Sequence, residues 1–268
     1  TRSLCDWSSD VCSSDLEHYS ILFDMPLFAD QEALKKGRNK VKFHRDIPTR
    51  IGVIPRYGAS ESIRWFEASP CYMYHTINAW EEGDEIVLLG CKVVEPEPPD
   101  RGEGELARML QFLRLDARLY SWRMNLKTGA VKEGFMDDAN TEFPTLNMNF
   151  LGRPSRYAYN VHIAPDPTLL FDGLVKYDTV TGQAWQHRFG PGRYGSEAPF
   201  APRQGATAED DGYLLSFIYD APSDTSELLI IDARDMLAEP VARVRIPQRV
   251  PLGFHACWVP GENLPRAR

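Results

Sequence analysis

The chain has 268 residues, of which 43% are hydrophobic and 25% are charged, a composition that allows a sizeable buried core. Its formal net charge is -8, and no Lys or Arg cluster interrupts the acidic excess, which argues against nucleic acid as a partner because phosphate binding needs concentrated positive charge. No apolar run approaches the ~18 residues that a membrane-spanning helix requires.

Short alternating segments that end at Gly, Pro, Asn or Asp predict strands along nearly the whole chain. The predicted strands cover residues 19–24, 50–55, 62–68, 71–80, 85–94, 118–125, 130–136, 156–163, 173–178, 183–189, 212–220, 227–232 and 241–246. Two segments break this pattern: a loop with a short helix is expected at 25–37, and an inserted amphipathic helix at 104–115. The second helix either packs on a sheet, or lines an apolar tunnel or touches a membrane surface.

An internal repeat predicts the arrangement of these strands. The segment 122–129 resembles 175–182, and 229–234 is a weaker third copy, so that Asn125, Asp178 and Asp232 recur at about fifty residues. A hairpin with this period is typical of a β-propeller, in which each blade is a small antiparallel sheet that covers its neighbours. The sequence therefore predicts an all-β propeller of roughly four to five blades with a short inserted helix.

Two histidines stand in apolar surroundings far apart in the sequence. His75 lies in the predicted strand before an acidic turn at 81–84, and His255 lies in the run 250–260 between the small residues Gly253 and Ala256. A buried imidazole needs a hydrogen-bond partner. Two interpretations remain open on this pattern alone: both are core histidines that donate to backbone carbonyls, or the space beside them serves a ligand.

Cysteine usage gives a further constraint. Outside the first 16 residues the chain has Cys71, Cys91 and Cys257, an odd number without CxxC spacing. Zinc sites and disulfide frameworks are therefore not expected, and a reducing cytoplasm is the default compartment.

Motifs in a fixed order resemble the carotenoid cleavage oxygenase family, which includes the lignostilbene and apocarotenoid dioxygenases. The residues Tyr74-His75-Thr76-Ile77-Asn78-Ala79-Trp80-Glu81 are similar to the family motif FH-x-x-NA-x-E with Tyr for Phe, and Gly253-Phe254-His255-Ala256 is similar to GFHG with Ala for the last Gly. Further matches are 19–27, Glu142-Phe143-Pro144, 156–159, 196–200, 202–203 and 209–212. The resemblance covers about residues 17 to 260.

The resemblance implies a seven-bladed propeller that holds a non-haem Fe(II) on its axis with four histidines, three of which are steadied by glutamates. His75 matches the third ligand and His255 the fourth, while Glu142 and Glu197 match two of the glutamates, expected to pair with His75 and His255 in that order. Neutral imidazole suits iron, and an acceptor for the second ring nitrogen fixes tautomer and orientation. Taken alone, both glutamates would be interpreted as strand-end surface acids, and it is the family match that favours the pairing with the histidines. No catalytic residue beyond the metal ligands is implied.

The departures from the family are informative. A ligand histidine of the family falls eight residues before the position of Tyr19, where this chain has Val11, and the first ligand lies further upstream still. Residues 1–16 show neither helical nor strand periodicity and are expected to be a non-native leader. We therefore expect residues 17–268 to be a partial oxygenase propeller, a truncated and inactive copy.

The resemblance implies oxidative cleavage of a conjugated C=C bond in a carotenoid, apocarotenoid or stilbenoid to two carbonyl products. The expected partners are an apolar conjugated small molecule and O₂, without nucleic acid, and the expected location is cytoplasmic, with weak contact to a membrane surface as a further expectation. Two alternatives stay open: a redox-neutral isomerase and hydrolase of the same family, and a non-enzymatic propeller that serves as a binding module.

Overall fold

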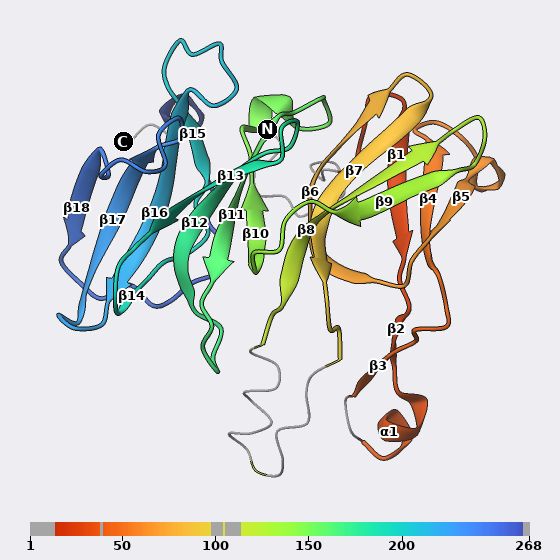
Figure 1. The fold of residues 1–268 in the computed structure, drawn as a ribbon, viewed down its shortest axis with the longest axis horizontal. Coiled ribbons are helices and arrows are strands. Elements are labelled where there is room, and N and C mark those ends of the chain that lie inside the picture. Colours follow the sequence, from red (N-terminus) through yellow and green to blue (C-terminus); the bar gives the residue numbers. More distant parts are fainter. Residues whose placement is uncertain (1–13, 38–39, 98–103, 105–113, 265–268) are drawn as a thin grey trace.

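The computed structural model describes residues 14–37, 40–97, 104 and 114–264. Within them, four antiparallel sheets stand side by side in the order of the chain (Figure 1). The first contains β1 (Tyr19–Asp24), β4 (Thr49–Pro55) and β5 (Arg64–Ala68). The second contains β6 (Tyr72–Glu82), β7 (Glu85–Val93), β8 (Ala117–Asn125) and β9 (Val131–Phe135).

The other two sheets follow the same plan. The third contains β10 (Thr141–Thr145), β11 (Tyr157–Ile163), β12 (Phe171–Asp178) and β13 (Gln183–Arg188). The fourth contains β14 (Arg193–Tyr194), β16 (Gly212–Asp220), β17 (Thr225–Asp232) and β18 (Ala242–Ile246), with β15 (Phe200–Pro202) also paired to β16. A ribbon of β2 (Leu27–Ala29) and β3 (Val41–Phe43) carries the short helix α1 (Gln31–Lys35), and single 3₁₀ turns occur at η2 (Ser60–Ser62), η3 (Met148–Phe150) and η4 (Gly261–Asn263).

The hydrophobic core lies between neighbouring sheets. Strand β7 shows this best: Ile86 and Leu88 pack with the first sheet, whereas Val87 and Leu89 pack with the third. All four are at most 2% exposed. Because successive side chains of a strand point to opposite faces, a strand buried on both faces reads as a continuous apolar run, and each such side chain contributes about 1.5–3 kcal/mol. This is the packing of consecutive propeller blades.

The repeat in the sequence corresponds to one structural device. Asn125, Asp178 and Asp232 each end the third strand of their sheet. In the first two the side-chain Oδ1 accepts hydrogen bonds of 2.9–3.1 Å from the backbone N–H groups two and three residues further on, and in the third from the N–H group two residues on at 2.9 Å. Gly129 and Gly182 then close the turn at φ of +80° and +75°. Short Asn and Asp side chains recur because they bond the backbone in this way.

Every strand expected from the sequence is present, with ends that shift by no more than two residues. The short helix expected within 25–37 is α1, which begins after the N-cap Asp30, whose side chain accepts from the N–H groups of Glu32 and Ala33. The amphipathic helix expected at 104–115 falls largely on 105–113, outside the described residues. Five short strands were not expected: β2, β3, β10, β14 and β15. The first 13 residues of the expected leader also lie outside the described residues, and its last residue, Leu16, is 2% exposed.

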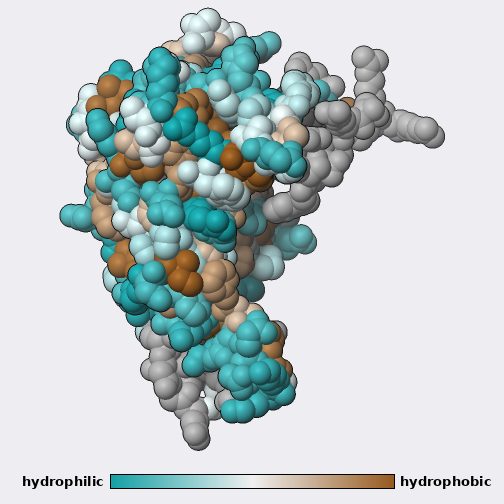
Figure 2. Space-filling view, turned by 90° about the vertical axis from the view of Figure 1, so that its right-hand side faces the viewer, coloured by the Kyte–Doolittle hydropathy of each residue, from teal (hydrophilic) through white to brown (hydrophobic). Residues whose placement is uncertain are grey.

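The sheet of β1, β4 and β5 ends the row on the right of Figure 1, and Figure 2 views the molecule from this side. The described residues there are mostly hydrophilic, and hydrophobic side chains appear in small separate groups. Leu22 and Trp65 on this sheet are each 42% exposed, and the guanidinium of Arg50 lies 5.0 Å from the Trp65 ring. None of the described helices is both long and apolar enough to cross a bilayer.

Candidate metal centre

His75 lies on β6 at a place where the strand departs from regular pairing. Met73 pairs with Lys92 and Thr76 with Gly90, so two residues of β6, one of them His75, stand opposite a single residue of β7. Such a bulge bends the strand and redirects side chains. A Cβ on Gly90 would lie 3.1 Å from the sulfur of Met73 and 3.4 Å from the carbonyl oxygen of His75, so glycine favours this close approach, and a side chain would require Met73 to shift by a few tenths of an ångström.

Glu142 on β10 holds the ring of His75. The Nδ1 atom of His75 lies 2.7 Å from Oε2 of Glu142, and the carboxylate is fully buried while the imidazole is 31% exposed. Burial lowers the pKa of His75, but the hydrogen bond to Glu142 and the negative charges of Glu142 and Glu197 outweigh it, so that its pKa lies above the ordinary value. The pairing fixes which nitrogen carries the proton and leaves Nε2 for a ligand.

Asn78 belongs to the motif around His75, and the sequence alone indicated no role for it. Its side chain is fully buried, and its amide nitrogen donates to the carbonyl oxygens of Phe150 and Arg153, both at 3.0 Å, and to the hydroxyl of Ser155 at 2.9 Å. Its amide oxygen accepts from the N–H of Gly152 at 2.9 Å. The residue therefore ties β6 to the loop between β10 and β11, which keeps the strand of His75 beside the strand of Glu142. The sequence signal that could have pointed to this role is a polar residue three positions after the histidine in an otherwise apolar strand.

His255 lies in the segment after β18, which forms no strand, and Glu197 holds this segment in place. The N–H of Ala256 donates to Oε2 of Glu197 at 2.8 Å, and the backbone N–H of Glu197 donates to the carbonyl of Phe254 at 3.2 Å. Nδ1 of His255 lies 3.4 Å from the same carboxylate oxygen. Burial raises the pKa of Glu197, against the hydrogen bond from Ala256 and the nearby imidazoles.

The structure brings the two histidines together although 180 positions separate them in the sequence. Their ring centroids are 5.2 Å apart with an interplanar angle of 77°. Each ring has a glutamate at its Nδ1 side, Glu142 for His75 and Glu197 for His255, in the order expected from the sequence. With exposed fractions of 31% and 47%, neither imidazole is a fully buried core residue, and the contacts at Nδ1 are to carboxylates rather than to backbone carbonyls.

The arrangement suits a cation. Two imidazoles that bind one ion through bonds of about 2.1 Å have ring centroids about 4.5–6.5 Å apart, and the observed separation lies inside this range. Among the described residues, the buried carboxylate of Glu142 has His75 as its ion-pair partner, and its second oxygen, Oε1, accepts no hydrogen bond. A carboxylate oxygen buried without a hydrogen-bond donor is costly, and a cation nearby would offset this cost.

The ligand set within the described residues is incomplete. No group of three or more His, Cys, Asp or Glu side chains among them is placed to hold a metal ion.

The other histidines have separate roles: His18 pairs with Glu81, His162 with Asp172, and His187 contacts the carbonyl oxygen of Met236 at 3.0 Å. His44 packs against the ring of Phe28. By these contacts the four histidines are structural or surface residues.

Comparisons with known proteins match this picture. The family model described as RPE65, retinal pigment epithelial membrane protein, matches residues 16–260. The carotenoid 9,10(9',10')-cleavage dioxygenase of Crocus sativus is 40% identical over 265 residues, which is 92% of this chain and 48% of that protein.

Two solved structures are similar in fold. The lignostilbene dioxygenase of Pseudomonas brassicacearum superposes with a TM-score of 0.79 at 27% identity, covering 92% of this chain and 54% of the other. The cobalt-substituted apocarotenoid oxygenase of Synechocystis gives a TM-score of 0.78 at 28% identity, covering 90% and 51%. The chain thus spans about half the length of the relatives it matches.

Proposed function

The chain belongs to the RPE65 family, the carotenoid cleavage oxygenases, and we propose that it supplies half of the metal site of a non-haem Fe(II)-dependent dioxygenase. The proposed substrate class is a conjugated carotenoid, apocarotenoid or stilbenoid, cut at one C=C bond to two carbonyl products. The observation that carries the proposal is the meeting of His75 and His255 at 5.2 Å between ring centroids, each with a glutamate at Nδ1.

In the proposed site, His75 and His255 bind Fe(II) through Nε2, and Glu142 and Glu197 hold the two rings in the required tautomer. When bound, Fe(II) supplies the chemistry of dioxygen activation. The aromatic rings of Phe143, Phe171 and Phe254 lie together beside the imidazoles, with centroid separations of 5.1–6.0 Å. Phe254, which is 46% exposed, provides an apolar surface for a conjugated substrate, and the buried rings of Phe143 and Phe171 pack with it.

The chain alone is proposed to bind Fe(II) weakly and to turn over no substrate, because two imidazoles are half of the ligand set that the family uses. Activity is therefore tested in a completed protein, which we define as this chain joined behind the N-terminal half of the Crocus sativus relative. The family match over residues 16–260 places the junction near residue 16.

In the completed protein loaded with Fe(II), an apocarotenoid or stilbene is expected to be cleaved under ¹⁸O₂ with label in both carbonyl products. Substitution His75→Ala is expected to reduce turnover by at least about 100-fold, because it removes a metal ligand. His162→Ala is the matched control, since His162 also contacts a carboxylate, Asp172 Oδ1 at 2.6 Å, but lies outside the site. Mass spectrometry of the products is the measurement.

Two results would contradict the proposal. With an ester of a conjugated alcohol as substrate, an isomerised alcohol and a free acid in place of two carbonyl products would indicate the redox-neutral isomerisation and ester cleavage instead. Full activity in the His75→Ala variant would mean that this imidazole binds no catalytic metal.

A further inference from the structure

Phe143 adopts a backbone conformation that its residue type rarely shows. Its φ is +49°, in the left-handed region, and the only other non-glycine residue with positive φ among the described residues is Asp224. Pro144 follows directly, and a proline restricts the preceding residue to extended conformations. Strain of this kind persists only where the surrounding structure enforces it, and it occurs most often at functional sites.

The strain coincides with a bulge that changes where the side chains point. Phe143 and Pro144 of β10 stand opposite the single residue Asn160 of β11. In a regular strand Glu142 and Phe143 would point to opposite faces. Here both reach His75: the Glu142 carboxylate is 2.7 Å from its Nδ1, and the Phe143 ring centroid is 5.1 Å from its ring centroid. The N–H of Phe143 also donates to the carboxylate of Glu142.

The ring of Phe143 contacts the second histidine as well. Its centroid lies 5.5 Å from that of His255 and 5.4 Å from that of Phe254, on which it stacks at an interplanar angle of 13°. Phe143 is 7% exposed, so its own orientation is fixed by packing. The segment of His255 forms no strand, and this stack and the contacts of Glu197 contribute to holding it in place.

We propose that Phe143 is a positioning residue that fixes the ring orientations of both His75 and His255, and that the left-handed backbone exists to aim its ring between them. The inference deepens the proposed function, since it concerns the same two imidazoles. A phenylalanine that only fills the core explains the burial but not the strain, because an ordinary extended residue fills space equally well. A ring that must lie against two imidazoles from an adjacent strand does need the bulge.

The test uses this chain as it is, without metal, with ¹⁵N-labelled histidine at alkaline pH, where the imidazoles are neutral. Long-range ¹H–¹⁵N spectra are expected to show one tautomer for His75 and one for His255. In Phe143→Leu both sets of signals are expected to shift toward values averaged over two tautomers. Phe143→Tyr, which keeps the ring, is expected to restore the original signals.

The matched control is Phe200→Leu. Phe200 is 3% exposed and packs in the same core on Tyr159, with ring centroids 5.6 Å apart. It is expected to lower stability in urea to a similar extent while the histidine signals stay unchanged. If Phe143→Leu does not fold, Phe254→Leu removes the same stack at a residue that is 46% exposed, and averaged His255 signals are then the expected result.

A second measurement addresses the backbone. Phe143→Gly is expected to unfold at a higher urea concentration than Phe143→Ala, the reverse of the usual order within a strand, because glycine adopts φ of +49° without strain. The proposal would be overturned if the histidine signals stay fixed in Phe143→Leu or in Phe254→Leu. It would also be overturned if the alanine variant is more stable than the glycine variant. The Phe143 test adds no metal, so its outcome does not depend on metal binding. A completed protein that fails to bind metal would contradict the proposed function but not the positioning role of Phe143.

Discussion

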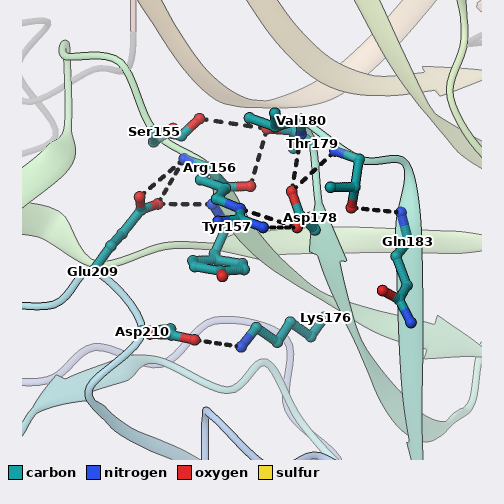
Figure 3. A network of polar contacts seen from close by, with 11 residues as sticks. Ser155, Arg156, Tyr157, Lys176, Asp178, Thr179, Val180, Gln183, Glu209 and Asp210 are labelled. Atoms are coloured by element: carbon teal, nitrogen blue, oxygen red, sulfur yellow. Dashed lines mark hydrogen bonds and ion pairs between the residues drawn. The ribbon is translucent and has the colours of Figure 1, made fainter.

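Replacing Asp210 with Asn is expected to lower the free energy of unfolding by about 3–5 kcal/mol, because the change leaves a buried ammonium group without its counter-charge. Lys176 on β12 has a side chain that is 5% exposed, and its Nζ lies 2.8 Å from Oδ2 of Asp210 (Figure 3). The same Nζ donates to the carbonyl oxygen of Ala233 at 2.8 Å. Nζ also lies 4.2 Å from the ring centroid of Tyr157. The pair therefore links the third sheet to the loop between β15 and β16 of the fourth sheet.

A double substitution separates the ion pair from general disruption of this contact. Lys176→Met removes the buried charge, so adding Asp210→Asn to it is expected to cost far less than Asp210→Asn alone. Asp84→Asn is the control, because Lys127 and Asp84 form an ion pair of 2.7 Å with side chains 73% and 53% exposed, and it is expected to cost less than about 1 kcal/mol. Urea unfolding measures all four variants. Additive losses from the two buried substitutions would mean that the charges do not interact.

Substitution Glu142→Gln is expected to weaken metal binding by the completed protein about 10- to 100-fold, the usual effect of removing a charged partner from a ligand imidazole. Glutamine keeps the size and one acceptor oxygen, but it removes the negative charge that faces His75 from a fully buried position. The dissociation constant is measured by titration with Co²⁺, followed by visible absorption.

The matched control for this substitution is Glu81→Gln. Glu81 contacts Nδ1 of His18 at 2.9 Å, which is the same chemistry, but the imidazole of His18 is 68% exposed. We expect the Glu81→Gln protein to bind Co²⁺ as tightly as the unsubstituted one. An equal loss in both variants would show that net charge, rather than the orientation of His75, determines the affinity.

Strands such as β7 and β16 were predictable from the sequence because alternation, β-branched content and turn residues act locally. β10 was not, because its five residues include Pro144 and a bulge, both of which disfavour a strand on local grounds. Glu142 was therefore placed by the family motif alone, and the structure supplied the strand that carries it. The repeat that ends at Asn125 and Asp178 could be recognised in the sequence because each of these side chains accepts hydrogen bonds from the backbone of the turn that follows it.

The contacts of the site are tertiary and were only partly predictable. The pairing of His75 with Glu142, across 67 positions, followed from the resemblance and matches the observed contact of 2.7 Å. The ring of Phe143 between the histidines could not be foreseen, since it depends on a left-handed residue within a bulge. The four hydrogen bonds of Asn78 likewise depend on a loop of the next sheet, which no periodicity in the sequence reveals.

We propose that His75 and His255 bind one and the same metal ion. Crystals of the completed protein loaded with Co²⁺ allow a direct test, because anomalous scattering locates the ion independently of the protein atoms. We expect a single peak about 2.1 Å from Nε2 of both histidines, with Glu142 and Glu197 on the far sides of the two rings. A peak beside only one of these imidazoles, or at a place that neither reaches, would contradict it.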